Sequence, residues 1–323
     1  MTTATPPLAT TPDRRVVAAL VALVAGAIAM GVSPVFVRHA DVGPFASAFW
    51  RAALALPVLA VWARLERRTD VPLPRWNRAT IAAGVLFAGD LFFWHLAIMN
   101  TTAANATLLA TLAPFWVMLA SGALLKEPVT RPMALGLAVC LCGAAMLVGS
   151  SFALAPERLD GDFFGLVTSL FFGGYFIAMR FARRGVAGMT PGLLVYRSTL
   201  VTAAVLFVAA LALEEVLLPS SVKGIAMLVA LGIFSHAAGQ GLLAYALGTL
   251  SAGFSALVIF LEAVAAATMG YVFLGESVSI AQGAGGAVIL AGIYIARPRS
   301  NAGVAVSRPA HRSRRHLTRK DPR

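Results

Sequence analysis

Asp90 is an acidic residue near the middle of a long apolar run, where a charge is costly. Trp94 follows four residues later, so the two side chains share one face if the run is helical. An acid beside an aromatic ring suits a cationic or aromatic ligand, or a group that binds a proton. The alternative is a neutral or helix-paired Asp90 that only fixes packing. Carboxylates inside a bilayer usually face a cavity or pathway, so both interpretations are kept.

His236 and Gln240 form a second polar pair, also four residues apart in an apolar run. The pair could hydrogen-bond a polar ligand, and His236 could move a proton. A hydrogen-bonded clamp between two helices is the alternative. We favour cavity lining, because polar residues inside a bilayer face the interior of the bundle.

Glu262 lies near the middle of a later apolar run. It could carry protons, or it could form a structural ion pair with Arg197, because a buried ion needs a partner in either case. Arg51 and Arg197 lie within two turns of the starts of their helices, so both could instead extend to the membrane surface. His95 is expected at the interface.

Pro114 removes a backbone donor from a fourth apolar run and should kink its helix. Broken helices at a repeat interface often mark transporter sites. Asn105 and Thr111, just upstream, could face the same cavity. The predicted substrate-binding or coupling set is Asp90, Trp94, Asn105, Pro114, Tyr175, Arg197, His236, Gln240 and Glu262. We expect no catalytic residue, metal or cofactor.

The composition of the chain explains why these groups stand out. Apolar residues make up 59% of the 323 residues and charged residues 12%, against roughly 45–50% and about 25% in soluble domains. A water-soluble fold could not cover so much apolar surface. Cys140 and Cys142 lie two residues apart on different helix faces, so a disulfide is not expected.

Hydropathy divides the chain into ten segments of about 20 residues, the length that a bilayer requires. The predicted fold is therefore an all-α integral membrane protein with ten transmembrane helices. An uncleaved first span is preferred to a signal peptide, although Ala27-Ile28-Ala29 resembles a cleavage site. The predicted spans are 16–37, 45–63, 79–99, 103–125, 132–150, 163–182, 191–212, 224–247, 252–274 and 280–296.

The basic residues predict the orientation. With both termini in the cytoplasm, 12 basic residues fall in inside segments and nine more in the C-terminal tail. Outside segments carry only Arg38, Arg158 and Lys223. This bias follows the positive-inside rule and argues against nucleic acid as the reason for the net charge of +12.

The chain also repeats itself at an offset of 149 residues. Glu127 and Glu276 each close an apolar run, and Gly136 and Gly143 match Gly285 and Gly292. Five spans in each half make the second half enter the membrane inverted, as in many secondary transporters. The expected organisation is a cytoplasmic tail (1–15), a first half (16–150), a second half (151–297) and a basic, disordered cytoplasmic tail (298–323).

Several short motifs resemble the EamA-type drug/metabolite transporters over about residues 16–297. Pro44 with Trp50-Arg51 resembles the start of the family's second helix, and Gly31-Val32-Ser33-Pro34 resembles its first-helix motif. Leu112-Ala113-Pro114-Phe115 running to Glu127 is similar to its fourth helix. Leu261-Glu262-Ala263-Val264 running to Glu276 is similar to the second-half version, except that Ala263 replaces a proline. Ala263 lacks the kinking effect of a proline, which weakens any claim of symmetric hinges.

The resemblance implies a central cavity between helices 1–4 and 6–9, with helices 5 and 10 at the periphery, where they often support dimers. Small residues on those two helices suit a homodimer contact or packing within the chain equally well.

The predicted function is a secondary active transporter, with export the default direction, of small metabolites such as amino acids or drugs across the cytoplasmic membrane. No Gly-x-x-x-x-Gly-Lys-Ser/Thr sequence is present, so ATP would not drive it directly. A non-transporting scaffold or sensor that uses the basic tail is the main alternative. A membrane enzyme is less favoured, because the spans hold no zinc or nucleophile motif.

Overall fold

The computed structural model describes residues 14–101, 103–148, 159–184, 186–275 and 279–297. The expected N-terminal and C-terminal tails and Glu276 lie wholly or largely outside these ranges. Within them every regular element is helical. The helices are α1 (Arg14–Gly31), α2 (Ser33–His39), α3 (Pro44–Leu65), α4 (Arg78–Asn100), α5 (Ala103–Ala110), α6 (Ala113–Ala120), η1 (Ser121–Leu125), α7 (Arg131–Val148), α8 (Leu159–Arg183), α9 (Pro191–Leu213), α10 (Val222–Ala230), η4 (Leu231–Gln240), α11 (Gly241–Ala246), α12 (Ala252–Val258), α13 (Phe260–Leu274) and α14 (Ile280–Ala296).

Eight helical segments in the described chain are long and apolar enough to cross a bilayer, and two shorter apolar helices accompany them. The shorter ones are Arg131–Met146 and Ile280–Ala296. Large apolar side chains remain exposed along these segments, including Val21, Leu119 and Leu170. Such a surface is stable against lipid and not against water. The protein is therefore a multi-pass membrane protein.

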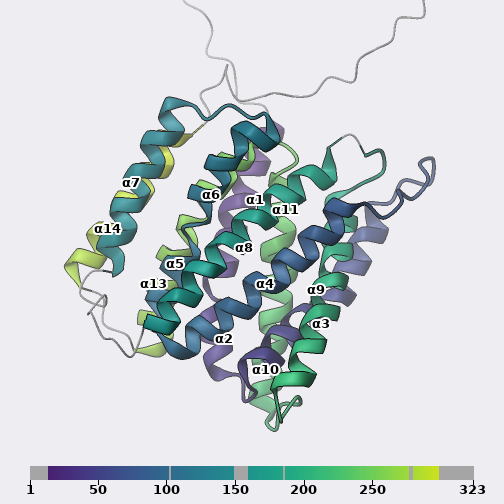
Figure 1. Cartoon of the computed structure of the whole chain (residues 1–323), viewed down its shortest axis with the longest axis horizontal. Coiled ribbons are helices and arrows are strands. Elements are labelled where there is room, and N and C mark those ends of the chain that lie inside the picture. Colours follow the sequence, from purple (N-terminus) through teal and green to yellow (C-terminus); the bar gives the residue numbers. More distant parts are fainter. Residues whose placement is uncertain (1–13, 102, 149–158, 185, 276–278, 298–323) are drawn as a thin grey trace, which may run out of the picture.

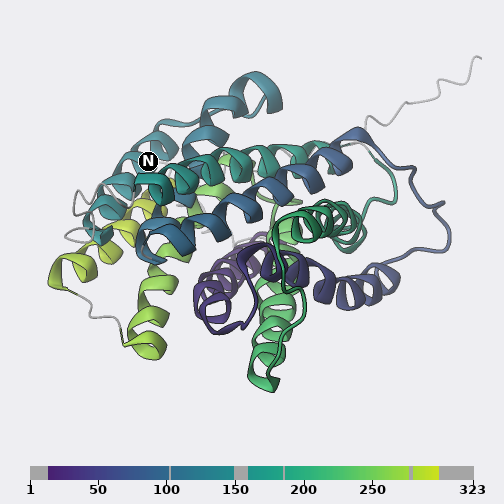
Figure 2. The same ribbon diagram turned by 60° about the horizontal axis from the view of Figure 1, so that its bottom comes forward.

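The helices run between two faces of one bundle (Figure 1). We call the face where α1 begins and α14 ends the terminal face, and the opposite one the distal face. The connection between α3 and α4, residues 66–77, belongs to the terminal face and extends outward at the right of Figures 1 and 2. Consecutive spans alternate in direction between the faces.

Several spans are interrupted inside the bundle. The kink expected from Pro114 is present, since α5 ends at Ala110 and α6 begins at Ala113. The second half breaks at the corresponding place, Ile259, without a proline. There the N–H of Ile259 donates to Ala256 at 3.0 Å and the N–H of Glu262 donates to Ile259 at 2.8 Å. These tight i to i+3 bonds replace α-helical ones, so a short interruption is present here although Ala263 stands in place of a proline.

The span that holds His236 and Gln240 is longer than its first-half counterpart. Its N-cap, Ser221, lies 144 residues after Asn77, the N-cap of α4, whereas its C-cap, Leu247, lies 146 residues after Thr101, the C-cap of α4. The extra residues are accommodated by the π-helical segment η4, because a π-turn holds more residues than an α-turn. Such segments often occur at functional sites.

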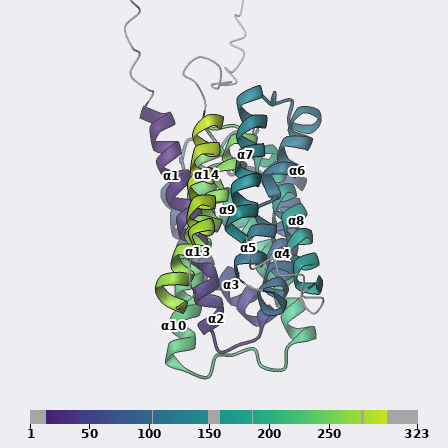
Figure 3. The same ribbon diagram turned by 90° about the vertical axis from the view of Figure 1, so that its left-hand side faces the viewer.

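The small residues of α7 and α14 pack against each other within the chain (Figures 1 and 3). A Cβ at Gly136 would lie 2.7 Å from the carbonyl oxygen of Gly292, and one at Gly143 would lie 2.7 Å from that of Gly285. The two helices are therefore antiparallel and in backbone contact. Their glycine faces are used inside the chain, so a homodimer through these helices would need their other faces.

We expect Gly143→Ala to destabilise the protein by about 1–3 kcal/mol, the usual cost of overpacking. The added methyl group would meet backbone atoms of Gly285 and Ile289, which cannot rotate away. The midpoint of thermal unfolding in detergent measures the effect. Gly283→Ala, on α14, is the matched control, because a Cβ there meets no atom within 4 Å. Equal midpoints for both variants would contradict the packing argument.

Candidate functional site

A small cavity lies in the interior of the bundle, between helices of both halves. Its volume, measured as the space that the centre of a water molecule can occupy, is about 20 Å³, which is roughly enough for one water. Seven helical segments contribute to its wall: α1, α3, α4, α5, α8, η4 and α13, with Thr111 at the break that follows α5. The lining residues are Met30, Arg51, Phe87, Asp90, Leu91, Trp94, Ala110, Thr111, Phe172, Gln240 and Glu262.

Three ionisable side chains line this cavity: Arg51, Asp90 and Glu262. Arg51 is 4% exposed and Asp90 is 6% exposed. The Arg51 guanidinium lies 5.5 Å from the centre of the Trp94 ring and within electrostatic reach of both carboxyls. Among the described residues, none of the three side chains makes a hydrogen bond or a direct ion pair. The cavity therefore contains ionisable groups whose hydrogen-bonding capacity is not satisfied by the described residues.

Gln240 and His236 carry further unpartnered atoms. Gln240 lines the cavity, and its Nε2 lies 3.1 Å from the sulfur of Met30 while its Oε1 has no partner. His236 lies just behind the lining, with Nε2 2.9 Å from the hydroxyl of Thr199 and Nδ1 unpartnered. Both side chains are fully buried, so η4 presents polar groups to the interior, as its sequence predicts.

Aromatic rings form the rest of the wall. Phe87 stacks on Tyr175 with ring centres 4.6 Å apart, and Tyr175 continues to Phe172 at 6.2 Å. His236 meets the edge of Phe87 at 5.3 Å. Tyr175 is 1% exposed and supports the lining ring without itself reaching the cavity. An apolar or aromatic body would fit against this wall.

The structure brings Asp90, Trp94, Gln240 and Glu262 of the predicted set directly to the cavity. Tyr175 and His236 lie in the layer behind. Pro114 is buried at the start of α6 and acts through the helix break. Asn105 belongs to α5, but its side chain lies outside the described residues.

Arg197 does not lie at the cavity and does not pair with Glu262. Its guanidinium donates to the carbonyl of Pro74 at 2.8 Å and lies 5.1 Å from the centre of the Trp76 ring. Because it is close to the start of α9, its long side chain reaches the loop at the terminal face. The partner within reach of Glu262 is Arg51 instead.

His95 was expected at the membrane interface and is instead fully buried. Its Nδ1 bonds the carbonyl of Leu91 at 2.7 Å, and its ring meets Trp94 at 5.0 Å. The end of α4 packs against other helices on several sides, so position along the span did not predict exposure.

Glu127 holds the terminal face together. Its Oε1 accepts from Arg180 at 2.7 Å and from Arg184 at 2.9 Å, and its Oε2 accepts from the N–H of Ala252 at 2.9 Å. One carboxylate, just after η1, thus ties the end of the fourth predicted span to α8 and to the start of α12. We call Glu127, Arg180, Arg184 and Ala252 the terminal latch.

Asp41 holds the distal face together. Its Oδ2 accepts from the hydroxyl of Ser220 at 2.8 Å and from the N–H of Ser221 at 2.6 Å. Hydrogen bonds, led by that of the Ser220 hydroxyl, lower the pKa of Asp41 from 3.8 to about 2. A Cβ at Gly224 would overlap this carboxylate. Asp41, Ser220 and Ser221 form the distal latch.

Two further carboxylates cap helices of the opposite half. Glu66, just after α3, accepts from the N–H of Gly192 at the start of α9 at 2.8 Å. Glu214, just after α9, accepts from the N–H of Phe45 at the start of α3 at 2.8 Å. Each satisfies an N–H that a helix start leaves without a partner. The two contacts are reciprocal between the halves.

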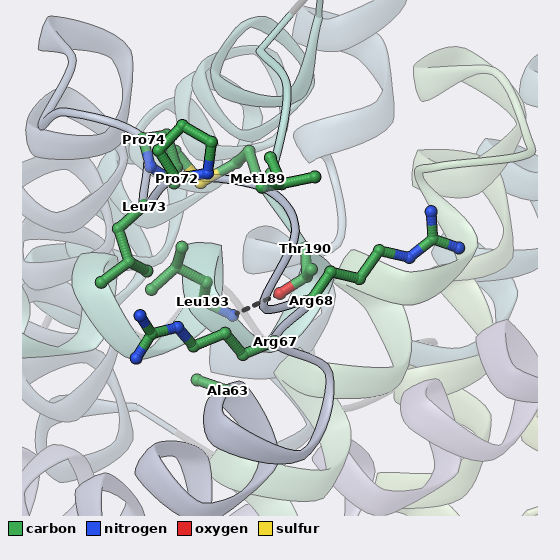
Figure 4. Close-up of a pocket in the computed structure, with 11 residues that line it drawn as sticks. Ala63, Arg67, Arg68, Pro72, Leu73, Pro74, Met189, Thr190 and Leu193 are labelled. Atoms are coloured by element: carbon green, nitrogen blue, oxygen red, sulfur yellow. Dashed lines mark hydrogen bonds between the residues drawn. The ribbon is translucent and has the colours of Figure 1, made fainter.

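A second hollow, of about 240 Å³, opens at the terminal face between the α3–α4 connection and the start of α9 (Figure 4). Arg67 and Arg68 extend to opposite sides in this view, and Thr190 accepts a hydrogen bond from the N–H of Leu193 at 3.2 Å. Both arginines are exposed. No intramembrane polar residue reaches this hollow, so the central cavity is the better candidate site.

Sequence reasoning left Arg51, Met30, Phe87 and Phe172 out of the site. The signal for Arg51 was its charge inside an apolar run, which was equally compatible with a side chain that reaches the surface. Apolar and aromatic residues such as Phe87 give no signal in one sequence, because ordinary core residues look the same.

The fold and the cavity define a polytopic helical membrane protein with a polar site enclosed by both halves. A family model of the EamA-like transporter family matches residues 17–149 and again 159–297. The chain belongs to this family of membrane transporters.

A relative from Archaeoglobus fulgidus, described as an "uncharacterized transporter", is 27% identical over 279 residues, which cover 85% of this chain and 94% of the relative. A protein crystal structure resembles the chain with a TM-score of 0.71 at 20% identity, over 88% of this chain and 97% of its own. At that identity the likeness shows the fold alone.

Proposed function

We propose that the protein is a secondary active transporter that exports small amine-bearing metabolites, such as amino acids or cationic drugs, by alternating access. The observation that carries this proposal is the internal cavity, where Arg51 and Asp90 lie buried and Glu262 half-buried, without hydrogen-bond partners among the described residues. Buried charges are retained where a ligand or coupling ion meets them. Membership of a transporter family suggests that this chain has no enzymatic activity.

We infer further that the two halves form an inverted repeat of five spans each. Supporting contacts join residues that are equivalent between the halves. Cys140 lies 3.5 Å from the carbonyl oxygen of Ile289, 149 residues later, and Phe87 meets His236 at the same separation in sequence. Equivalent residues touch only near a two-fold axis that relates the halves. The antiparallel α7 and α14 support the same arrangement.

Alternating access would then open the two latches in turn. The terminal latch and the distal latch lie on opposite faces, and both are closed in this structure. The bias of basic residues in the loops supports a terminal face on the cytoplasmic side of the cell membrane. Under this proposal, the structure is the closed state between inward and outward opening. A homodimer that contacts through other faces of α7 and α14 remains part of the proposal.

Three probes with one aromatic body and different charges test the function. Phenethylamine is a cation, phenylalanine a zwitterion and phenylacetate an anion at neutral pH. We expect phenethylamine to raise the midpoint temperature of thermal unfolding of the purified protein. At a concentration of 100 times Kd, binding adds about 2.7 kcal/mol to the free energy of unfolding. Phenylacetate should not, because two carboxyls face it.

The double variant Asp90→Asn with Glu262→Gln should lose the shift and should also lose counterflow of the amine in vesicles. The matched control is Glu215→Gln, which alters an exposed carboxyl. If no probe and no wider panel of amines stabilises the protein or shows counterflow, the proposed function is wrong.

A further inference from the structure

We propose that the closed cavity binds one proton, shared between Asp90 and Glu262, and that a monovalent organic cation replaces this proton one for one. The second part rests on the proposed function. The first part concerns the empty protein and stands without it.

The side chains that line the cavity carry a net charge when all are ionised. Among the residues that the structure describes, Arg51 from α3, Asp90 from α4 and Glu262 from α13 are its only ionisable lining residues. Each carboxyl lies within electrostatic reach of Arg51 and of the other carboxyl. One guanidinium and two carboxylates sum to a single negative charge. A charge without a counter-charge is strongly disfavoured at this depth.

The volume of the cavity limits which species can neutralise this charge. About 20 Å³ holds roughly one water. A metal cation with its hydration shell does not fit. A proton needs no space, and we assign the neutralising charge of the closed cavity to it.

Four further polar side chains surround the three ionisable groups. The groups facing the three charges from neighbouring helices are Tyr175 on α8, His236 and Gln240 on η4, and His95 on α4. Both histidines lie within electrostatic reach of Arg51, so a second positive charge on either would stand beside the guanidinium. We count all four as neutral. They leave the charge balance of the lining unchanged.

Unpartnered buried atoms are an independent sign of a ligand. Nε of Arg51 and Oε1 of Gln240 have no hydrogen-bond partner, and both side chains are more than nine-tenths buried. Both lie in the cavity wall. A ligand with an ammonium group and a polar or aromatic body would satisfy Gln240, Asp90 and Glu262.

The exchange follows from the balance of charge. When a monovalent cation enters, its ammonium group compensates the negative charge, and the proton leaves its carboxyl for the solution on the open side. When the cation leaves, a proton returns. The cavity is neutral with either ligand, but it must widen from its present size of about 20 Å³ to enclose the organic cation. It closes less readily with both ligands or with neither. An inward proton gradient would then drive export of the cation.

Infrared spectroscopy of the purified protein at pH 7 counts the protonated carboxyls through their C=O stretching band. We expect one in the wild type, none in Asp90→Asn and none in Glu262→Gln, because each single variant pairs one carboxylate with Arg51. Arg51→Met should show two. Glu215→Gln, at an exposed position, should match the wild type.

An absent band in the wild type would overturn the proposal. Loss of the band in only one of the two carboxyl variants would overturn the sharing. If Arg51→Met does not fold, the two carboxyl variants still decide the count, since both substitutions are nearly isosteric.

Addition of phenethylamine tests the exchange. Saturation should remove the band and release one proton per protein into weakly buffered solution, measured with an indicator dye. Phenylalanine, with no net charge, should release none. Binding of phenethylamine without proton release would refute the exchange. Failure of every amine to bind would refute the exchange and the proposed function together, and would leave the proton count to the variants.

Discussion

After subtraction of the uptake by protein-free vesicles, in which the neutral amine crosses the lipid and is trapped by protonation, wild-type vesicles with an acidic interior should concentrate phenethylamine. Vesicles that contain Glu262→Gln should lose nearly all of this transporter-dependent, pH-driven uptake. With glutamine at this position the empty cavity is already neutral and has no proton to exchange. A bound cation would leave an uncompensated charge that costs at least about 2.5–3.5 kcal/mol, so uptake should fall by about 100-fold. The initial rate with radiolabelled phenethylamine measures the effect.

The control for this experiment is Glu215→Gln, which removes an exposed carboxyl far from the cavity and should leave the rate and its pH dependence unchanged. Wild-type pH dependence in Glu262→Gln would rule out Glu262 as a proton carrier.

Opening of the terminal face in Glu127→Gln is the second large effect that we expect. The substitution removes the charge that meets Arg180 and Arg184 and weakens the bond to Ala252. A loss of about 1.4 kcal/mol, the size of one charged hydrogen bond, would raise the open population about tenfold. A cysteine at Thr111, in the cavity wall, reports it through labelling by an impermeant maleimide from the terminal face. Cys140 and Cys142 are replaced by alanine in this background.

The distal latch supplies the matched experiment. Asp41→Asn should raise labelling of the same cysteine from the distal face and not from the terminal face. The pKa of Asp41 is depressed to about 2, so its contribution is complete above its ordinary pKa and is lost only as the pH falls through about 2. Labelling of the wild type from the distal face should therefore be flat between pH 4 and 8, after correction for maleimide chemistry. Faster labelling from both faces in either single variant would contradict independent latches.

Much of the fold could be predicted from the sequence, because a bilayer imposes length and apolarity on each span. Nearly all predicted spans begin and end within a few residues of the observed helices. The exposed side chains of these helices face lipid, so hydropathy alone located them. What it could not locate were interruptions that depend on packing, such as Ile259, where no proline marks the break.

The candidate site was only partly predictable, for a physical reason. A charged residue in an apolar run signals that it must be compensated, and this found Asp90 and Glu262. The identity of the partner depends on the distance between helices, which one sequence does not contain. Arg197 and Arg51 looked equivalent, yet the first reaches the loop carbonyl of Pro74 and the second turns into the cavity.

The exchange of helix caps between Glu66 and Glu214 has a consequence for how the chain unfolds. In each half, the start of one helix is capped by a carboxylate from the other half. If one half melted, the other would leave the N–H at a helix start unsatisfied and would lose a neighbouring helix at once. We therefore expect the two halves, each of which matches the same family model, to unfold as a single cooperative unit.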